Sequence, residues 1–210
     1  MSVRRPVRRL LLVVLGIVAV AGLGLAQQPM MSASEAKLRM AMRDAWDAHA
    51  RWTRAYIVSS LAGLPDFTRA NSRLLENADE VAGALKPYYQ DPVVWPLISL
   101  LKRHVLLTGA VVTAARDGDS LRISTARADW SAGSDSLLQF LARTNSNWGD
   151  GRLGAVLQRY QDQTWRQIAA RTRHDWMADV AACDQANMEA QGIADALSAG
   201  IVKQFPDKFK

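Results

Sequence analysis

The sequence predicts an all-α protein, a single up-and-down helical bundle of four to five long helices with short connecting helices over residues 34–210. Three observations predict this fold class. Apolar residues recur at alternating steps of three and four over long segments, glycine and proline fall mostly between those segments, and no stretch shows the sustained alternation of a strand. Helices with one apolar face must bury it, so these segments are expected to pack around one core.

The first long helix is expected to begin at a capping box formed by Ser32 and Glu35 and to end at the turn that contains Pro65. Residues 66–86 are predicted to form shorter helical pieces, interrupted near Asn77. The core-facing stripe of the first helix is expected to comprise Leu38, Met42, Ala45, His49, Trp52 and Tyr56.

The remaining long helices are predicted from Pro92, from about Ser120, after the turn-rich segment "TNSNWGDG", and from about His174 to Lys203. Each carries a stripe with the same spacing. The four stripes are Leu97, Leu101, His104, Thr108, Val111 and Ala115; Ile123, Ala126, Trp130, Leu137 and Phe140; Leu153, Leu157, Tyr160, Thr164 and Gln167; and Val180, Asp184, Asn187, Gln191, Ala194, Ser198 and Ile201.

The N-terminus has the layout of a bacterial export signal. Four arginines within the first nine residues precede an uncharged run over residues 10–26, in which Gly24 and Ala26 supply the small residues of a cleavage site. The run is also near the lower limit for a membrane span, so residues 1–26 are predicted to be a signal peptide or membrane anchor. Residues 27–33 are expected to form a linker. The protein is therefore expected to be exported, either periplasmic or secreted, or tethered by its N-terminal segment.

Charge and cysteine content restrict the partners. The formal net charge is +6, but without the four N-terminal arginines 22 basic residues face 20 acidic ones. A nucleic-acid-binding surface needs a stronger excess, so no nucleic acid is expected. Membrane contact is expected only through residues 10–26 if they are not cleaved. Cys183 is the single cysteine, which excludes an internal disulfide.

Polar residues interrupt the predicted stripes near mid-helix. His49 and His104 lie on two different helices, with Tyr160 at the matching position of a third. Buried polar groups need partners, so these residues are expected to form a hydrogen-bonded layer or to bind a small ligand or ion. The predicted layer comprises His49, Trp52, Tyr56, His104, Trp130, Tyr160, Asp184 and Asn187. A metal site formed by His49, His104 and Asp184 is the alternative, with a divalent ion as the cofactor.

No catalytic signature accompanies this layer. The chain lacks a nucleophile elbow, a glycine-rich phosphate loop and the Glu-x-x-His pairs of carboxylate metal centres. The sequence therefore predicts an exported, non-enzymatic bundle that binds a small ligand, an ion or an envelope protein through the polar layer or the bundle ends, without a cofactor. A metal-dependent bundle is the alternative.

Several motifs resemble a family of small bacterial all-helical proteins. These are "HARWTR" over residues 49–54, which gives H-x-x-W-T-R, and "QFPDKF" over residues 204–209, which gives Q-F-P-x-K-F. Some members carry the labels glycosyltransferase or acetylglutamate kinase, but this chain has no sugar-transfer or nucleotide-binding motif. The resemblance implies matches at His49, Trp52, Arg54, His104, Trp130 and Asp184, whereas relatives often have histidine at the positions of Tyr160 and Asn187 and asparagine at that of Gly133.

Overall fold

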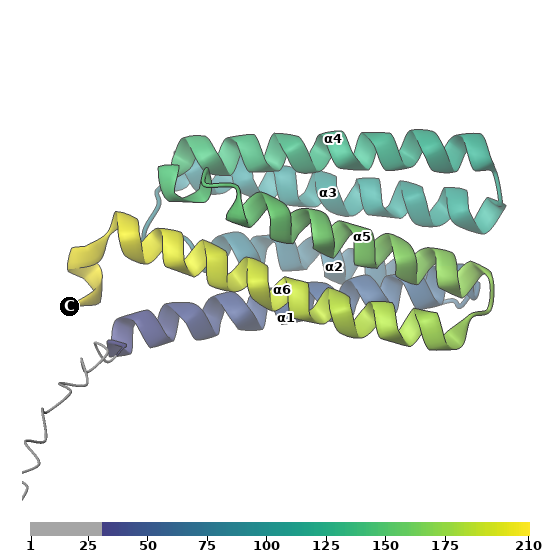
Figure 1. Cartoon of the computed structure of the whole chain (residues 1–210), viewed down its shortest axis with the longest axis horizontal. Helices are drawn as coiled ribbons and strands as arrows, with labels where there is room; N and C mark the ends of the chain where they lie inside the picture. Colours follow the sequence, from purple (N-terminus) through teal and green to yellow (C-terminus); the bar gives the residue numbers. More distant parts are fainter. Residues whose placement is uncertain (1–30) are drawn as a thin grey trace, which may run out of the picture. The chain divides into compact units, whose positions relative to one another are not determined.

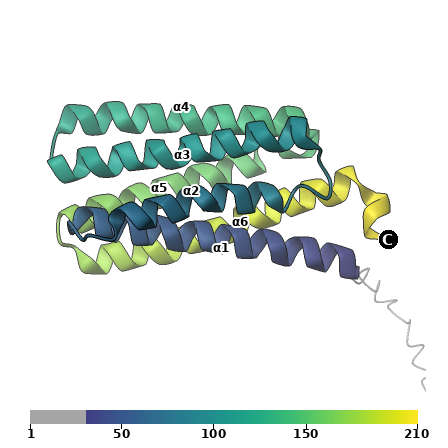
Figure 2. The ribbon, with the colours of Figure 1, turned by 180° about the vertical axis from the view of Figure 1, so that it is seen from behind.

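The computed structural model describes residues 31–210. Within them the chain forms six α-helices, two short 3-10 helices and no strand, which confirms the predicted all-α bundle (Figures 1 and 2). The predicted export segment, residues 1–26, lies outside the described residues, as does most of the predicted linker. The elements are α1 (Ala33–Leu61), α2 (Phe67–Gly83), α3 (Asp91–Asp117), α4 (Ser120–Thr144), η1 (Ser146–Trp148), α5 (Arg152–Thr172), α6 (Trp176–Gln204) and η2 (Pro206–Phe209).

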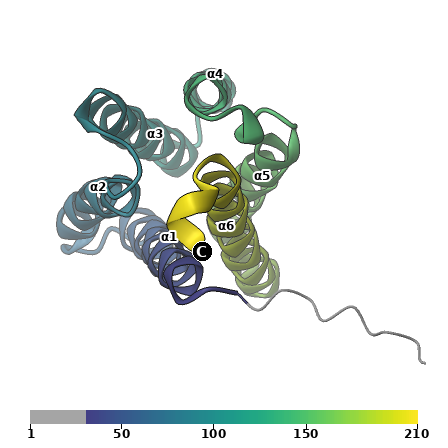
Figure 3. The same ribbon diagram turned by 90° about the vertical axis from the view of Figure 1, so that its left-hand side faces the viewer.

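Successive helices run up and down the bundle. Viewed along its length, α1 to α5 follow one another around the bundle, and α6 returns to lie between α5 and α1 (Figure 3). The bundle has one helix more than the sequence predicts because α2 is continuous across residues 67–83. The predicted interruption near Asn77 is wrong, because this side chain is fully buried and hydrogen-bonded inside the bundle and so stabilises the helix there.

Local sequence explains where the helices begin and end. The Ser32 hydroxyl accepts a hydrogen bond from the Glu35 backbone N–H at 3.3 Å, as expected of an N-cap. The predicted capping box would have the Glu35 carboxylate accept from the Ser32 backbone N–H. In the structure this carboxylate binds Arg39, one turn later, at 2.8 Å. Gly118 ends α3 with a φ of 70°, a left-handed conformation that glycine adopts without a steric penalty.

The apolar core consists of two clusters at different heights in the bundle. The larger one contains Trp46, Leu101 and Leu137 and lies toward the end with the C-terminus. The smaller one contains Tyr56 and Trp130 and lies toward the other end. Buried polar side chains lie where the two clusters meet, among them His49, Thr53, His104 and Ser134. The core is therefore divided by a buried polar layer.

The C-terminal residues close one end of the bundle. Phe209 is buried and stacks on Tyr88, with ring centroids 5.5 Å apart. The Tyr89 hydroxyl donates to Gln204 at 2.5 Å, and the Lys208 ammonium donates to the backbone carbonyl of Pro87 at 2.8 Å. The Q-F-P-x-K-F segment therefore binds the connection between α2 and α3.

Within residues 31–210, α3 alone is long and apolar enough to cross a membrane, judged by its length and a mean hydropathy of 1.4. Half of its most apolar stretch is buried inside the bundle. A core helix of a folded domain has the same composition, and α3 supplies Leu97, Leu101 and Val111 to the core.

Replacement of Gly200 by alanine is expected to destabilise the protein by about 1–3 kcal/mol. A Cβ atom at this position would lie 2.1 Å from Nε1 of Trp148, whose buried ring donates a hydrogen bond to the Leu197 carbonyl. Gly154→Ala is the matched control, because its nearest neighbour would be a Leu138 methyl group at 3.6 Å. Urea unfolding measures both changes, and equal stability of the two variants would contradict the expectation.

Candidate functional site

Three of the predicted residues meet in the buried polar layer. His49 on α1 and His104 on α3 have ring centroids 6.4 Å apart, and Tyr160 on α5 lies 5.9 Å from His49. The rings of Trp46 and Trp130 flank the pair, 5.2 Å from His49 and 5.8 Å from His104. Both histidines are buried, with exposed fractions of 5% and 8%. The positions of His49, His104 and Tyr160 in the predicted stripes therefore indicated that these three residues lie together in the interior.

The contacts of Asn77 determine which nitrogen of His49 carries the proton. The Asn77 side-chain amide nitrogen donates to the Ala45 carbonyl and to Glu80, both at 3.0 Å, so its oxygen is the free acceptor. That oxygen lies 3.0 Å from Nδ1 of His49. His49 therefore carries its proton on Nδ1, and Nε2 keeps a lone pair.

His104 has the same arrangement on the opposite side of the layer. The Ser134 hydroxyl donates to the Trp130 carbonyl at 3.2 Å, so it accepts from Nδ1 of His104 at 3.4 Å. Nε2 of His104 is therefore also an unprotonated nitrogen. No hydrogen bond to Nε2 of either ring is formed among residues 31–210.

Burial makes this layer uncharged at neutral pH. It lowers the pKa of His49 to about 4, and burial together with the nearby His49 lowers the pKa of His104 to about 3. Burial raises the pKa of Tyr160 to about 12, and its hydroxyl donates to Thr53 at 3.4 Å. The layer therefore contains neutral imidazoles and a neutral phenol.

Four predicted members of the layer lie elsewhere. Trp52 is half-buried against α2, where Arg73 lies over its ring at 5.3 Å. Tyr56 is buried, but in the smaller apolar cluster. Asp184 and Asn187 are exposed, so placing them in the interior was wrong.

The predicted metal site of His49, His104 and Asp184 is therefore not formed. Residues 31–210 contain no group of three or more histidine, cysteine, aspartate or glutamate side chains placed to hold a metal ion. The error lies in the phase of α6, because the buried residues in its first half are Asp179, Ala182, Ala186 and Ala190 rather than the predicted stripe. The small alanine side chains give a weak apolar signal.

The buried acid of α6 is Asp179, which the sequence analysis missed. Its carboxylate forms ion pairs with Arg54 on α1 and with Arg171 on α5, the latter at 2.8 Å. Burial raises the pKa of Asp179, but hydrogen bonds from the two guanidinium groups and their charges outweigh it and hold the pKa below its usual value. Arg54 belongs to the H-x-x-W-T-R motif, and this was the only sequence signal for the cluster.

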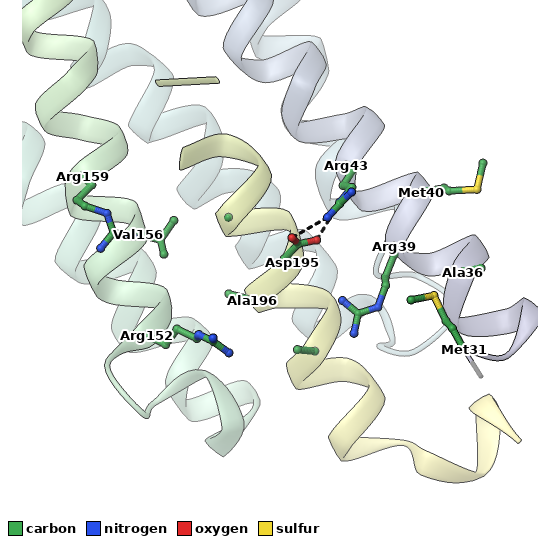
Figure 4. Close-up of a pocket in the computed structure, with 12 residues that line it drawn as sticks. Met31, Ala36, Arg39, Met40, Arg43, Arg152, Val156, Arg159, Asp195 and Ala196 are labelled. Carbon is green, nitrogen blue, oxygen red and sulfur yellow. Dashed lines mark hydrogen bonds and ion pairs between the residues drawn. The ribbon is translucent and has the colours of Figure 1, made fainter. Parts of the chain in front are cut away.

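The second candidate site is an open groove that the sequence analysis also missed. It has a volume of about 700 Å³ and lies across α6, between α1 and α5, near the start of α1 (Figure 4). Its charged lining is mainly arginine, from both flanking helices, with methionine and alanine around it. The lining arginines are Arg39, Arg43, Arg152 and Arg159.

Three of these arginines have carboxylate partners. Arg43 binds Asp195 through two hydrogen bonds of 2.9 and 2.8 Å, and Arg159 binds Glu189 at 2.9 Å. Arg39 binds Glu35. The side chain of Arg152 makes no ion pair within the described residues, so it is the free cation of the groove.

No protein family, no curated protein and no solved structure was found to match the chain. Membership of the helical family therefore stays a prediction from the motifs. The structure accounts for both motifs in local terms: His49 and Arg54 join α1 to its neighbours, and the terminal motif closes one end of the bundle.

The two histidines are expected to respond differently to replacement by leucine. His49→Leu leaves the fully buried oxygen of Asn77 without its donor and is expected to cost about 1–3 kcal/mol. His104→Leu is expected to cost less than about 1 kcal/mol, because Ser134 keeps its bond to the Trp130 carbonyl. Urea unfolding of both variants tests this order, and a larger loss for His104→Leu would contradict it.

Asp179 is expected to contribute stability that depends on pH. Because its pKa in the folded protein lies below the unfolded value of about 3.9, the stabilisation is complete above that value and is lost as the pH falls through the folded pKa. Asp179→Asn is therefore expected to lose at least about 2 kcal/mol at pH 7.

The stability difference between wild type and Asp179→Asn is expected to be constant above about pH 5 and to narrow as the pH falls below about 4. Thermal unfolding at several pH values measures it. Asp195→Asn is the control, because Asp195 and its partner Arg43 are both largely exposed. A difference that stays constant with pH would contradict this role for Asp179.

Proposed function

We propose that the protein is an exported, non-enzymatic bundle that binds an anionic group, such as a phosphate or carboxylate, in the arginine groove. The observation that carries this proposal is the convergence of four guanidinium groups from α1 and α5, of which Arg152 has no carboxylate partner among residues 31–210. Guanidinium groups bind phosphates and carboxylates through paired N–H donors, so this lining favours an anion.

The groove suits a ligand with an apolar part beside the anion. Met31 and Met40, with exposed fractions of 54% and 65%, lie on its rim, and alanine side chains contribute to its lining (Figure 4). Methionine adapts to irregular apolar surfaces. These features support a small amphiphilic anion better than a fully hydrated ion.

The groove favours binding over catalysis. Asp195 is the acidic residue that lines it, and this carboxylate is held by both hydrogen bonds from Arg43. Arginine stays protonated at all physiological pH values and does not act as a base. No activated nucleophile accompanies the arginines in the lining.

Residues 1–26 support the export part of the proposal through their arginines, apolar run and small residues at the predicted cleavage site. N-terminal sequencing of protein from the periplasm and medium of an expressing bacterium tests this part, and protein retained in the cytoplasm would contradict it.

Isothermal titration with inorganic phosphate and with butyl phosphate tests the groove. Butyl phosphate is expected to bind more tightly than inorganic phosphate, and Arg152→Gln is expected to weaken its binding at least fivefold. Arg152 is exposed and without an ion pair, so the variant is expected to keep its stability.

The matched control is Arg103→Gln, an exposed arginine on α3 away from the groove. Equal loss of affinity in the two variants would show that net charge alone attracts the anion. Absence of binding to both phosphates would reject the proposal.

A further inference from the structure

We propose that the buried polar layer binds one Cu(I) ion between Nε2 of His49 and Nε2 of His104. This site is separate from the arginine groove and does not depend on it. It needs two ligands, whereas the metal site predicted from the sequence needed a third from Asp184, which is exposed.

The first argument is that the two rings present free lone pairs. Each histidine donates its Nδ1 proton to an outer partner, Asn77 on α2 or Ser134 on α4. In metal sites, a histidine ligand usually donates its other N–H in this way, which sets the tautomer and the orientation of the ring.

The second argument is the separation of the rings. A metal ion about 2 Å from each of two imidazole nitrogens, in a nearly linear arrangement, places the ring centroids about 6 Å apart. The centroids of His49 and His104 lie 6.4 Å apart. Linear coordination by two ligands is characteristic of Cu(I), whereas zinc takes about four ligands in a tetrahedron.

The third argument is charge. The layer residues His49, His104 and Tyr160 carry no carboxylate, and the buried carboxylate of Asp179 is already paired with Arg54 and Arg171. The cost of burying an ion rises with the square of its charge, so a divalent ion costs about four times as much as a monovalent one here. A monovalent ion with nitrogen ligands is therefore favoured.

The test is an anaerobic titration of the untagged full-length protein with Cu(I), in competition with the chelator bathocuproine disulfonate. Wild type is expected to retain one Cu(I) per chain, and His104→Leu is expected to bind it at least 100-fold more weakly. This variant is chosen because it leaves no buried partner of His104 unsatisfied, and circular dichroism and thermal melting check that it is folded.

His174→Asn is the matched control. His174 is exposed and has a φ of 59°, which asparagine tolerates. This variant is expected to bind Cu(I) as wild type does. No retained Cu(I) in folded wild type, full retention by folded His104→Leu, or Zn²⁺ binding of equal strength would each overturn the proposal.

Discussion

The hydrogen bond between Nδ1 of His49 and the side chain of Asn77 is the contact on which the arrangement of the bundle depends. It is 3.0 Å long and joins two buried side chains, and the Asn77 amide nitrogen also donates to the Ala45 carbonyl and to Glu80. An unsatisfied polar group there is costly, so a shift of α1 along α2 by one turn would be strongly unfavourable. Apolar contacts alone allow such shifts more readily, since one leucine can replace another.

A second set of polar contacts joins α1 to α6. Arg43 binds Asp195, Asp47 binds Gln191, and Arg54 binds Asp179. Residue numbers rise along α1 and fall along α6 in these pairs, as in two antiparallel helices. The energetic weight of these contacts differs with burial. Asp179 is almost fully buried and must stay paired, whereas Arg43 and Asp195 are largely exposed and contribute little to stability.

The burial of these ion pairs changes along the contact between α1 and α6. Where α1, α5 and α6 are close, arginine is held by a buried acid and stabilises the fold. Toward the start of α1 the same helices leave a groove, where Arg152 forms no ion pair with any residue of the range 31–210. The central layer differs from both, because its groups are neutral and its free positions are nitrogen lone pairs. We therefore propose two different ligand chemistries for one architecture.

The sequence by itself determined the fold class, the ends of most helices, and the meeting of His49, His104 and Tyr160, because strong apolar periodicity fixes which face of α1, α3 and α5 points inward. Only the tertiary structure decided the phase of α6 and the continuity of α2. Alanine marks a core face weakly, so packing against α1 and α5 rotated Asp179 inward and left Asp184 in solvent. Asn77 indicates a helix interruption when the sequence is considered alone, but it stabilises α2 through hydrogen bonds with His49 and with the Ala45 carbonyl, both on α1.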